Sequence, residues 1–463
     1  MQADMVRAVV GGVRAGIRYR SSSGFGIPKL GPPEVKFVPV DYKVTHILRK
    51  NELLLDLNGG PVNQLALNQL PSNNPIEDRL IVAQNKLTTG ATFGVFDGHG
   101  GSRMAQVVSQ RAPHYFALSV LPSQLLEDYV NSKNRPQLVK RIFSIDELND
   151  WQYNCHLTSL KRFAEEILNS TEHLTTSELL CKSFEFLDSE ISCEIQEKRD
   201  EEALTLAVQG CVATVAHITD QHLYVISTGD CRAVLGMCDD TGRWSARALN
   251  KEHNCDNVEE LQRIIGEHPT GEKNTIIRNE RLLGNLAPLR AFGDFHFKWS
   301  RDELNKFLVP LYGDRVIPHH YLTPPYLTAR PEVSHHILTP RDKFLVIATD
   351  GLWEMLGTQK VVQFIGQFMQ GIETANLLRT PENATLGSMQ RLLSKRKMDL
   401  SQKPVDTNAA THLIRHALGR SEYGLDHSRL AAYLGLPVKL ARSYRDDISI
   451  LVIFFNPQNL KGS

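Results

Sequence analysis

Residues 213–236 read ATVAHITDQHLYVISTGDCRAVLG, and this stretch decides the fold class. Two apolar runs, 213–218 and 222–227, flank the polar triplet Thr219-Asp220-Gln221, and a third run follows at 232–236. Short apolar runs joined by tight turns indicate strands that pair antiparallel with their neighbours, because a parallel pair needs a long crossover connection. We therefore expect antiparallel sheet rather than repeated strand–helix–strand units.

Other segments extend this pattern to a mixture of strands and helices. The runs from Phe344 to Thr349 and from Ile448 to Phe455 are nearly continuous in apolar side chains, which is typical of strands buried on both faces. Residues 125–200 instead show helical periodicity with many charges. Their apolar stripe includes Leu160, Phe163, Ile167 and Leu168. We interpret 125–200 as a helical insertion.

A second insertion is expected near 375–405, where the sequence is polar. We interpret its basic triplet, Lys395-Arg396-Lys397, as a solvated loop in preference to a docking patch. No linker divides the rest of the chain convincingly. We therefore expect 34–463 to form a single domain that carries both insertions.

Composition excludes several classes of protein. The chain has 463 residues, more than the roughly 250 to 300 at which a single core usually stops growing. Its 52 Lys and Arg balance 52 Asp and Glu, so net charge gives no reason to expect a nucleic-acid partner. No apolar run approaches the roughly 20 residues that cross a bilayer, so we expect no transmembrane segment. The 7 cysteines lack C-x-x-C spacing, which favours reduced thiols.

The first 33 residues form a separate basic segment. Its charged residues are Arg7, Arg14, Arg18, Arg20 and Lys29, against one acid, Asp4. An Arg-rich, acid-poor, amphipathic start is typical of an organelle transit peptide. A disordered basic tail is the alternative, since Gly11-Gly12 weakens any helix there. The sequence leaves both interpretations open.

Three aspartates stand where an expected strand stops or starts. Asp97 ends the strand in FGVFDGHGG, Asp350 ends the strand in LVIATDG, and Asp446 precedes the run ISILVIFF. Antiparallel packing can bring these strand ends together, and converging carboxylates repel one another unless a cation compensates. Ligation by oxygen alone favours Mg²⁺ or Mn²⁺ over zinc. An aspartate before a glycine is also a common turn former, which is the alternative for each residue taken alone.

Seven motifs in order along the chain resemble those of the metal-dependent Ser/Thr protein phosphatases of type 2C. They are PIEDR (75–79), FDGHGG (96–101), GCVAT (210–214), TGDCRA (228–233), RAFGD (290–294), ATDGLWE (348–354) and RDDI (445–448). The resemblance implies an α+β fold. It would be a four-layer αββα sandwich in which two central antiparallel β-sheets are flanked by helices, with helical and loop insertions.

Further motifs narrow the resemblance to the catalytic subunits of pyruvate dehydrogenase phosphatase. They are LP (70–71), FKW (297–299), LTPPYLT (322–328) and NAATHLIRHA (408–417). This resemblance implies a protein-serine phosphatase of the mitochondrial matrix that dephosphorylates pyruvate dehydrogenase and so reactivates the pyruvate dehydrogenase complex. It also implies docking to the lipoyl domain of dihydrolipoyl acetyltransferase. Ca²⁺ at a partner interface, a regulatory subunit and the isoform are left open.

The resemblance also implies a centre of two Mg²⁺ or Mn²⁺ ions. Asp97 would bridge the two ions, the Gly98 carbonyl would bind one, and Asp350 and Asp446 would complete the other. A water bridging the ions would attack phosphorus in line. His99 would act as the general acid that protonates the departing serine oxygen.

The remaining site residues come from the same resemblance. Glu77 and Asp78 would form an outer pair that positions waters. Asp230 would join a weaker third metal site, where this chain has Glu354 in place of the aspartate common in the family. Asn73 stands where the broader family has a phosphate-binding arginine, so the metals or another group must supply the grip on phosphate.

Other functions are compatible with parts of this pattern. A catalytically silent docking scaffold should have lost metal-ligating acids, but every matched inner-sphere acid is retained. A two-metal nuclease is disfavoured by the lack of a basic surface bias. A type 2C phosphatase with another mitochondrial phosphoprotein as its substrate remains an alternative.

Overall fold

The computed structural model describes residues 41–57, 60–144, 146–372, 385–399, 404–421 and 424–460. These residues fall into two compact units. The first unit comprises Glu77–Ala233 and Leu249–Leu338, and the second comprises 41–76, Val234–Ala248 and 339–460. The basic segment 1–33 lies outside the described residues, and the single domain expected over 34–463 stays a prediction.

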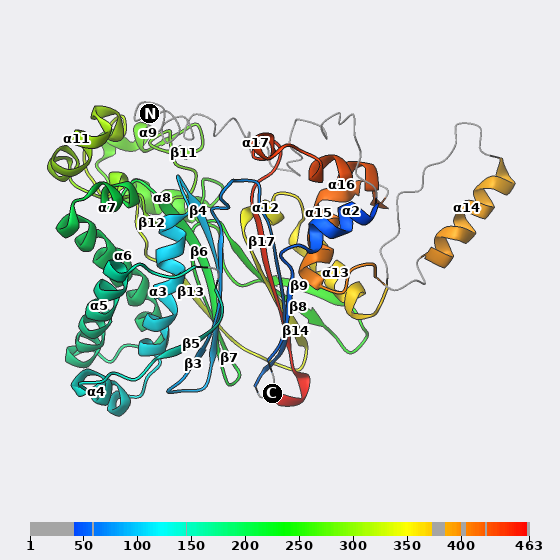
Figure 1. Ribbon diagram of the computed structural model, residues 1–463, viewed down its shortest axis with the longest axis horizontal. Helices are drawn as coiled ribbons and strands as arrows, with labels where there is room; N and C mark the ends of the chain where they lie inside the picture. Colours follow the sequence, from blue (N-terminus) through cyan, green and yellow to red (C-terminus); the bar gives the residue numbers. More distant parts are fainter. Residues whose placement is uncertain are drawn as a thin grey trace. The chain divides into compact units, whose positions relative to one another are not determined.

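The first unit contains a seven-stranded antiparallel sheet (Figure 1). Its strands run in the order β5 (Val139–Phe143), β3 (Arg79–Asn85), β4 (Ala91–His99), β6 (Gly210–Thr219), β7 (His222–Thr228) and β13 (Glu332–Ile337), and β12 (Phe292–Gly293) pairs with β6. Ala213 pairs with Thr228 and Thr219 pairs with His222. The hairpin predicted from the opening stretch is therefore confirmed.

Helices cover the first sheet. They are α3 (Arg103–Ser119), α4 (Ser123–Asn131), α5 (Asp150–Asn169), α6 (Thr176–Lys198) and α7 (Glu201–Leu206). α3 packs on β3, β4 and β6, while α5 and α6 pack on α3. Capping boxes begin α5 at Asn149 and α6 at Thr175, each satisfying free N–H groups of the first turn. The helices predicted within 125–200 are confirmed, and β5 is an edge strand that the periodicity did not predict.

The rest of the first unit, from Leu249 to β13, consists mainly of short elements. They are α8 (Val258–Gly266), α9 (Lys273–Ile276), the hairpin β10 (Ile277–Arg278) and β11 (Arg281–Leu282), α10 (Arg301–Glu303) and α11 (Val309–Tyr312). Glu260 of α8 is buried and accepts hydrogen bonds from Arg263 and Arg290. Burial raises the pKa of Glu260, but the two guanidinium groups outweigh burial and lower it to about 2. This ion network fixes α8 beside the chain that leads into β12.

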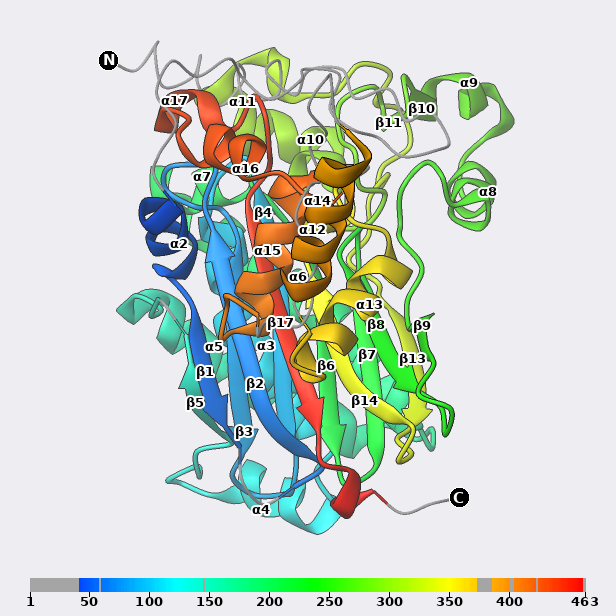
Figure 2. The same cartoon turned by 90° about the vertical axis from the view of Figure 1, so that its right-hand side faces the viewer.

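The second unit contains a six-stranded sheet. Its order is β1 (Leu53–Asp56), β2 (Val62–Leu70), β17 (Ile448–Phe455), β14 (Asp342–Ala348), β8 (Arg232–Cys238) and β9 (Trp244–Ala248). β17 lies between β2 and β14 and is antiparallel to both (Figure 2). All residues of β17 except Phe454 are buried. Both strands predicted to be buried on their two faces, β14 and β17, are confirmed.

Seven helices of the second unit lie among its described residues. They are α2 (Asp41–Arg49), α12 (Asp350–Trp353), α13 (Thr358–Met369), α14 (Leu386–Asp399), α15 (Ala409–Gly419), α16 (His427–Leu434) and α17 (Val438–Ala441), with a small hairpin of β15 (Arg420–Ser421) and β16 (Gly424–Leu425). α15 packs on β2 and β17. The predicted α+β class, with two antiparallel sheets flanked by helices, is confirmed.

The loop interpretation of Lys395-Arg396-Lys397 is wrong. This triplet lies within helix α14. Residues 388–399 contain no glycine or proline and are rich in Leu, Met, Arg and Lys, which are good helix formers. Polarity alone therefore did not distinguish a polar helix from a polar loop.

A buried ion pair joins α3 to α6 and gives a test of the helical layer. Arg111 donates two hydrogen bonds of 2.7 Å to Glu194, and the two side chains are 0% and 6% exposed. We expect Glu194→Ala to lower the free energy of unfolding by about 3–5 kcal/mol, because it leaves the guanidinium buried without its carboxylate. Urea denaturation followed by circular dichroism measures the change.

Glu165→Ala is the matched control for this measurement. Glu165 pairs with Lys161 at 3.2 Å on the outer surface of α5, and both side chains are about two fifths exposed. Its loss should cost only about 0.3–0.5 kcal/mol. A cost for Glu194→Ala as small as that of the control would contradict the structural role of the buried pair.

Candidate metal and catalytic site

The segment that contains Asp97 is part of a paired strand. Asp97, Gly98 and His99 pair with Val212, Cys211 and Gly210 of β6. The sequence predicted that the strand ends at Asp97 and that a glycine-rich turn follows at once. Instead β4 continues to His99, because Gly98 and His99 keep their antiparallel pairing with Cys211 and Gly210 of β6. Asp97 is thus held by a sheet ladder rather than by a loop.

Glu77 and Asp78 lie beside this strand end. They come directly before β3, whose first residue, Arg79, pairs with Phe96 of β4. A Cβ added to Gly98 would lie 2.6 Å from the backbone oxygen of Glu77, so only glycine fits there. Asp78 is 1% exposed. The structure therefore places the predicted outer pair next to the predicted metal-bridging segment.

His99 contacts an acid that the sequence did not single out. Its Nε2 lies 2.5 Å from Oδ2 of Asp294, and 29% of the histidine side chain is exposed. Burial is the largest influence and lowers the pKa of His99, but nearby carboxylates, Asp294 first, raise it above that of a free imidazole. The other carboxylates are those of Glu77 and Asp230. A raised pKa suits a histidine that must hold a proton to donate.

Asp230 follows a turn at Gly229 that two hydrogen bonds to His253 hold in place. The N–H of Gly229 donates to Nδ1 of His253 at 3.1 Å, and the N–H of His253 donates to the Gly229 oxygen at 2.8 Å. Burial lowers the pKa of His253 to about 4, so its neutral ring can accept that bond. Gly229 has a φ of 94°, and a Cβ there would lie 2.2 Å from Val212. Asp230 is thereby held close enough to His99 to raise its pKa.

In the second unit, two of the predicted metal ligands lie together. β14 and β17 are antiparallel, with Ala348 opposite Ile450, so Asp350 after β14 and Asp446 before β17 meet at the same sheet edge. A Cβ on Gly351 would lie 2.1 Å from the backbone oxygen of Asp447, which shows how closely the two chains approach. Burial, followed by the charge of Asp350, raises the pKa of Asp446 to about 7, although Arg442 opposes this. The convergence predicted for these two strand ends is confirmed.

Asn73 and Glu354 also take defined positions in the second unit. Asp447 accepts hydrogen bonds from the Asn73 N–H at 2.9 Å and from its Nδ2 at 3.1 Å. The Asn73 amide is therefore directed to a carboxylate and does not offer the positive charge of an arginine. Glu354 lies one helical turn after Asp350, and its N–H donates to the Asp350 oxygen at 2.9 Å. That spacing puts both acids on one side of the turn.

The donor chemistry of these residues fits a hard divalent cation. Carboxylates and carbonyl oxygens are the ligands that Mg²⁺ and Mn²⁺ prefer. The raised pKa of Asp446 shows that its charge is poorly compensated beside Asp350, which a cation would relieve. Neither unit, as far as its residues are described, gathers three or more His, Cys, Asp and Glu side chains in positions to hold a metal ion. The predicted ligand set draws on both units and stays a prediction.

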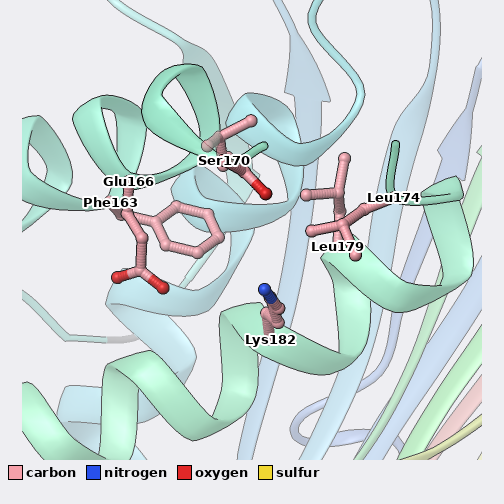
Figure 3. A pocket seen from close by; sticks show the side chains of 7 residues that line it. Phe163, Glu166, Ser170, Leu174, Leu179 and Lys182 are labelled. Atoms are coloured by element: carbon pink, nitrogen blue, oxygen red, sulfur yellow. The ribbon is translucent and has the colours of Figure 1, made fainter. Parts of the chain in front are cut away.

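A pocket elsewhere in the first unit holds none of these residues. It lies between α5 and α6, where Figure 3 shows Lys182 directed toward Ser170 and the ring of Phe163. Its lining consists of Phe163, Glu166, Ile167, Ser170, Leu174, Leu179 and Lys182.

The described helices include none that is long and apolar enough to span a membrane.

Comparison with known proteins identifies the family. The family model described as protein phosphatase 2C matches residues 153–385. Human pyruvate dehydrogenase (acetyl-transferring) phosphatase 2, mitochondrial, is 41% identical over 443 residues, which cover 90% of this chain and 84% of the relative. Human pyruvate dehydrogenase (acetyl-transferring) phosphatase 1, mitochondrial, is 40% identical over 451 residues, covering 91% and 84%.

A more distant relative and a solved structure were also found. Pyruvate dehydrogenase (acetyl-transferring) phosphatase 1, mitochondrial, of Saccharomyces cerevisiae is 29% identical over 436 residues, covering 84% of this chain and 68% of the relative. The crystal structure of serine-threonine phosphatase 2C from Toxoplasma gondii has a TM-score of 0.44 and 17% identity, covering 88% of this chain and 98% of that one. Because the family model matches residues 153–385 and two human relatives are 40% and 41% identical over 84% of their own length, the chain belongs to the protein phosphatase 2C family.

Proposed function

We propose that this metal-dependent phosphatase hydrolyses phosphoserine on pyruvate dehydrogenase in the mitochondrial matrix and so reactivates the pyruvate dehydrogenase complex. The observation that carries this proposal is 41% identity over 90% of the chain to a mitochondrial protein named for that activity. The identity extends well beyond the catalytic motifs and includes the helical segment 125–200. An alternative substrate in the same compartment would leave the chemistry unchanged.

We further propose that Asp97, the Gly98 carbonyl, Asp350 and Asp446 hold two Mg²⁺ or Mn²⁺ ions. The paired carboxylates of the second unit support this, because burial and mutual repulsion raise the pKa of Asp446. When bound, the two ions would lower the pKa of a water molecule and neutralise charge on the phosphate. A silent scaffold is disfavoured, because a protein freed from catalysis would gain stability by losing one of these acids.

The protein's own groups would carry the remaining chemistry. His99 would donate a proton to the serine oxygen as its bond to phosphorus breaks, which a raised pKa favours. Glu77 and Asp78 would orient water beside Gly98. Asn73 lacks charge, so the metals would balance most of the phosphate charge. Asp230 and Glu354 are proposed as the acids of a third, weaker metal site.

The partners of the reaction are proposed on the same basis. Docking to the lipoyl domain of dihydrolipoyl acetyltransferase, a response to Ca²⁺ and a regulatory subunit stay predictions. Dephosphorylation of the intact pyruvate dehydrogenase complex tests them together. The assay is run with and without free lipoyl domain as competitor, and with and without Ca²⁺. Competition by free lipoyl domain would support docking, and an unchanged rate would contradict it.

Metal removal tests the catalytic proposal. We expect Mn²⁺- or Mg²⁺-dependent release of phosphate from phosphorylated pyruvate dehydrogenase. Asp350→Asn should lower kcat/KM at least about 100-fold, because even groups that only support a metal ligand contribute about 10- to 100-fold. Asp240→Asn is the control, since Asp240 is 86% exposed and pairs at 3.2 Å with Arg341, which is also exposed. Full activity in excess EDTA would exclude a metal-dependent mechanism.

The pH dependence of stability provides a test that needs no substrate. The pKa of Asp446 is raised on folding, so the metal-free native state binds a proton that the unfolded chain releases between about pH 4 and 7. Ionisation of Asp446 therefore lowers the free energy of unfolding of the metal-free protein increasingly as pH rises to about 7. We expect Asp446→Asn to raise the melting temperature in EDTA at pH 8 more than at pH 4.5.

With Mn²⁺ in place of EDTA at pH 8, the wild type should have a higher melting temperature than Asp446→Asn. The ion would stabilise the wild type by binding the native state, and Asp446→Asn should respond little. Asp240→Asn serves again as the control and should follow the wild type under all conditions. A pH-independent difference between Asp446→Asn and wild type would show that the Asp446 carboxyl is not strained by its surroundings.

A further inference from the structure

A buried aspartate orients the histidine proposed as general acid. Asp294 is 2% exposed, and its Oδ2 lies 2.5 Å from Nε2 of His99. An ionised carboxylate can only accept a hydrogen bond, so Nε2 must carry the hydrogen of this contact. Nδ1 is then the ring nitrogen left to exchange a proton with another group. A histidine held in this way has one defined tautomer and one defined ring orientation.

The backbone holds Asp294 in a conformation that brings it to His99. Its φ is 47°, in the left-handed region, and its N–H donates to the Gln209 oxygen at 2.8 Å. Gly293 pairs with Gly210, the residue that also pairs with His99. A Cβ on Gly210 would lie 2.1 Å from both Asp294 Oδ2 and His99 Nε2. The contact therefore depends on the absence of a side chain at Gly210.

Helix α6 fixes this segment from outside the sheet. Asp188 accepts a hydrogen bond of 2.8 Å from the Gly293 N–H and one of 2.7 Å from Nζ of Lys298. The side chains of Asp188 and Lys298 are only 11% and 10% exposed. Lys298 also donates to the Ala291 oxygen at 2.8 Å. One carboxylate of α6 thus holds the chain on both sides of Asp294.

We propose that Asp294 is a positioning residue for His99 and that the Asp188–Lys298 pair of α6 keeps Asp294 in place. The inference rests on the proposed phosphatase reaction. As the phosphorus–oxygen bond to serine breaks, Oγ keeps the electron pair and takes the proton from Nδ1 of His99. Water supplies the new oxygen on phosphorus and releases its proton to solvent. The ring, now neutral, keeps its Nε2 hydrogen bond to Asp294, so it is ready for reprotonation at Nδ1.

Two substrates separate this role from a purely structural one. Serine alkoxide is a poor leaving group that needs a proton, whereas p-nitrophenolate leaves without one at neutral pH. At saturating Mn²⁺, we expect Asp294→Asn to lower kcat on a phosphoserine peptide about 100-fold, the lower bound of a general acid's contribution. Turnover of p-nitrophenyl phosphate and KM for the peptide should change little. A loss that is equal on both substrates would overturn the proposal.

A double-mutant cycle tests whether Asp294 acts through His99. His99→Asn should show the same selectivity for the phosphoserine peptide. Adding Asp294→Asn to His99→Asn should then cause no further loss, because the group to be positioned is gone. Additive losses would show that Asp294 acts by another route, and this outcome too would overturn the proposal.

The contribution of the Asp188–Lys298 pair is tested with variants of each residue. Asp188→Asn and Lys298→Met should each lower kcat on the phosphoserine peptide about 10-fold, a tenth of the general-acid contribution, with the same substrate selectivity. Glu185→Gln is the matched control on the same helix, since Glu185 is 41% exposed and lies 3.9 Å from Arg330. Glu185→Gln should match wild type on both substrates. If Asp188→Asn also matched wild type, the proposal that the Asp188–Lys298 pair keeps Asp294 in place would be refuted.

A nitrogen-15 spectrum of the histidines tests the same contact without catalysis. In the metal-free wild type at pH 8, His99, assigned with His99→Asn, should be the Nε2–H tautomer and should lose that preference in Asp294→Asn. An Nδ1–H tautomer in the wild type would overturn the positioning role. If wild type released no phosphate from the peptide in Mn²⁺, the proposed function would fail, and this spectrum would still decide the positioning.

Discussion

Two like charges held at one sheet edge are the constraint around which the second unit is built. The carboxylates of Asp350 and Asp446 lie together because β14 and β17 are antiparallel neighbours. Both strands bury side chains on two faces, so a slip of one residue would move every side chain to the opposite face and disrupt the packing on both. Burial of the strands therefore enforces a charge repulsion that the two acids would otherwise relieve by moving apart.

Burial first, and then the charge of Asp350, raise the pKa of Asp446. A proton relieves the repulsion below about pH 7, and above that pH a bound cation can do so while the strand register is kept. Arg442, which directly follows α17 and pairs with Asp446, is about half exposed and supplies partial relief. The same core packing that stabilises the sheet thus favours metal binding at its edge.

The first unit meets a different constraint, which is closeness of backbone rather than charge. Gly98 faces the backbone of Glu77, and Gly210 lies under the contact between His99 and Asp294. At both positions a single added methyl group would overlap an atom of the site. Since these glycines belong to paired strands, the polar groups around them are held by a rigid ladder, which positions a site more accurately than a loop does.

The sequence predicted those features that depend on local pattern and on the rule that antiparallel neighbours share an edge. The hairpin of β6 and β7, the buried strands and the meeting of Asp350 with Asp446 follow from apolar runs and their turns. Asp294 was missed as a site residue although its motif was noted, because it lies 195 residues from His99 and reaches it through a left-handed backbone. The extension of β4 to His99 was missed because consecutive glycines also predict a turn.

Helix α6 is better understood as part of the frame of the site than as an addition to it. Its Asp188 holds the chain around Asp294, while its Glu194 pairs with Arg111 of α3. α3 begins at Arg103, whose N–H donates to Oε1 of Gln209, and the backbone oxygen of Gln209 accepts a hydrogen bond from the Asp294 N–H.

His99 is therefore braced by two routes, one through β12 and one through the start of α3, and α6 joins them. Buried ion pairs are seldom an efficient source of stability, because desolvation of the two charges offsets most of their attraction. They do require one alignment of the elements they connect, since a shift of either element would leave a buried charge unpaired. Two such pairs on one helix fix its register against both α3 and β12, and that register is what the contact between His99 and Asp294 requires.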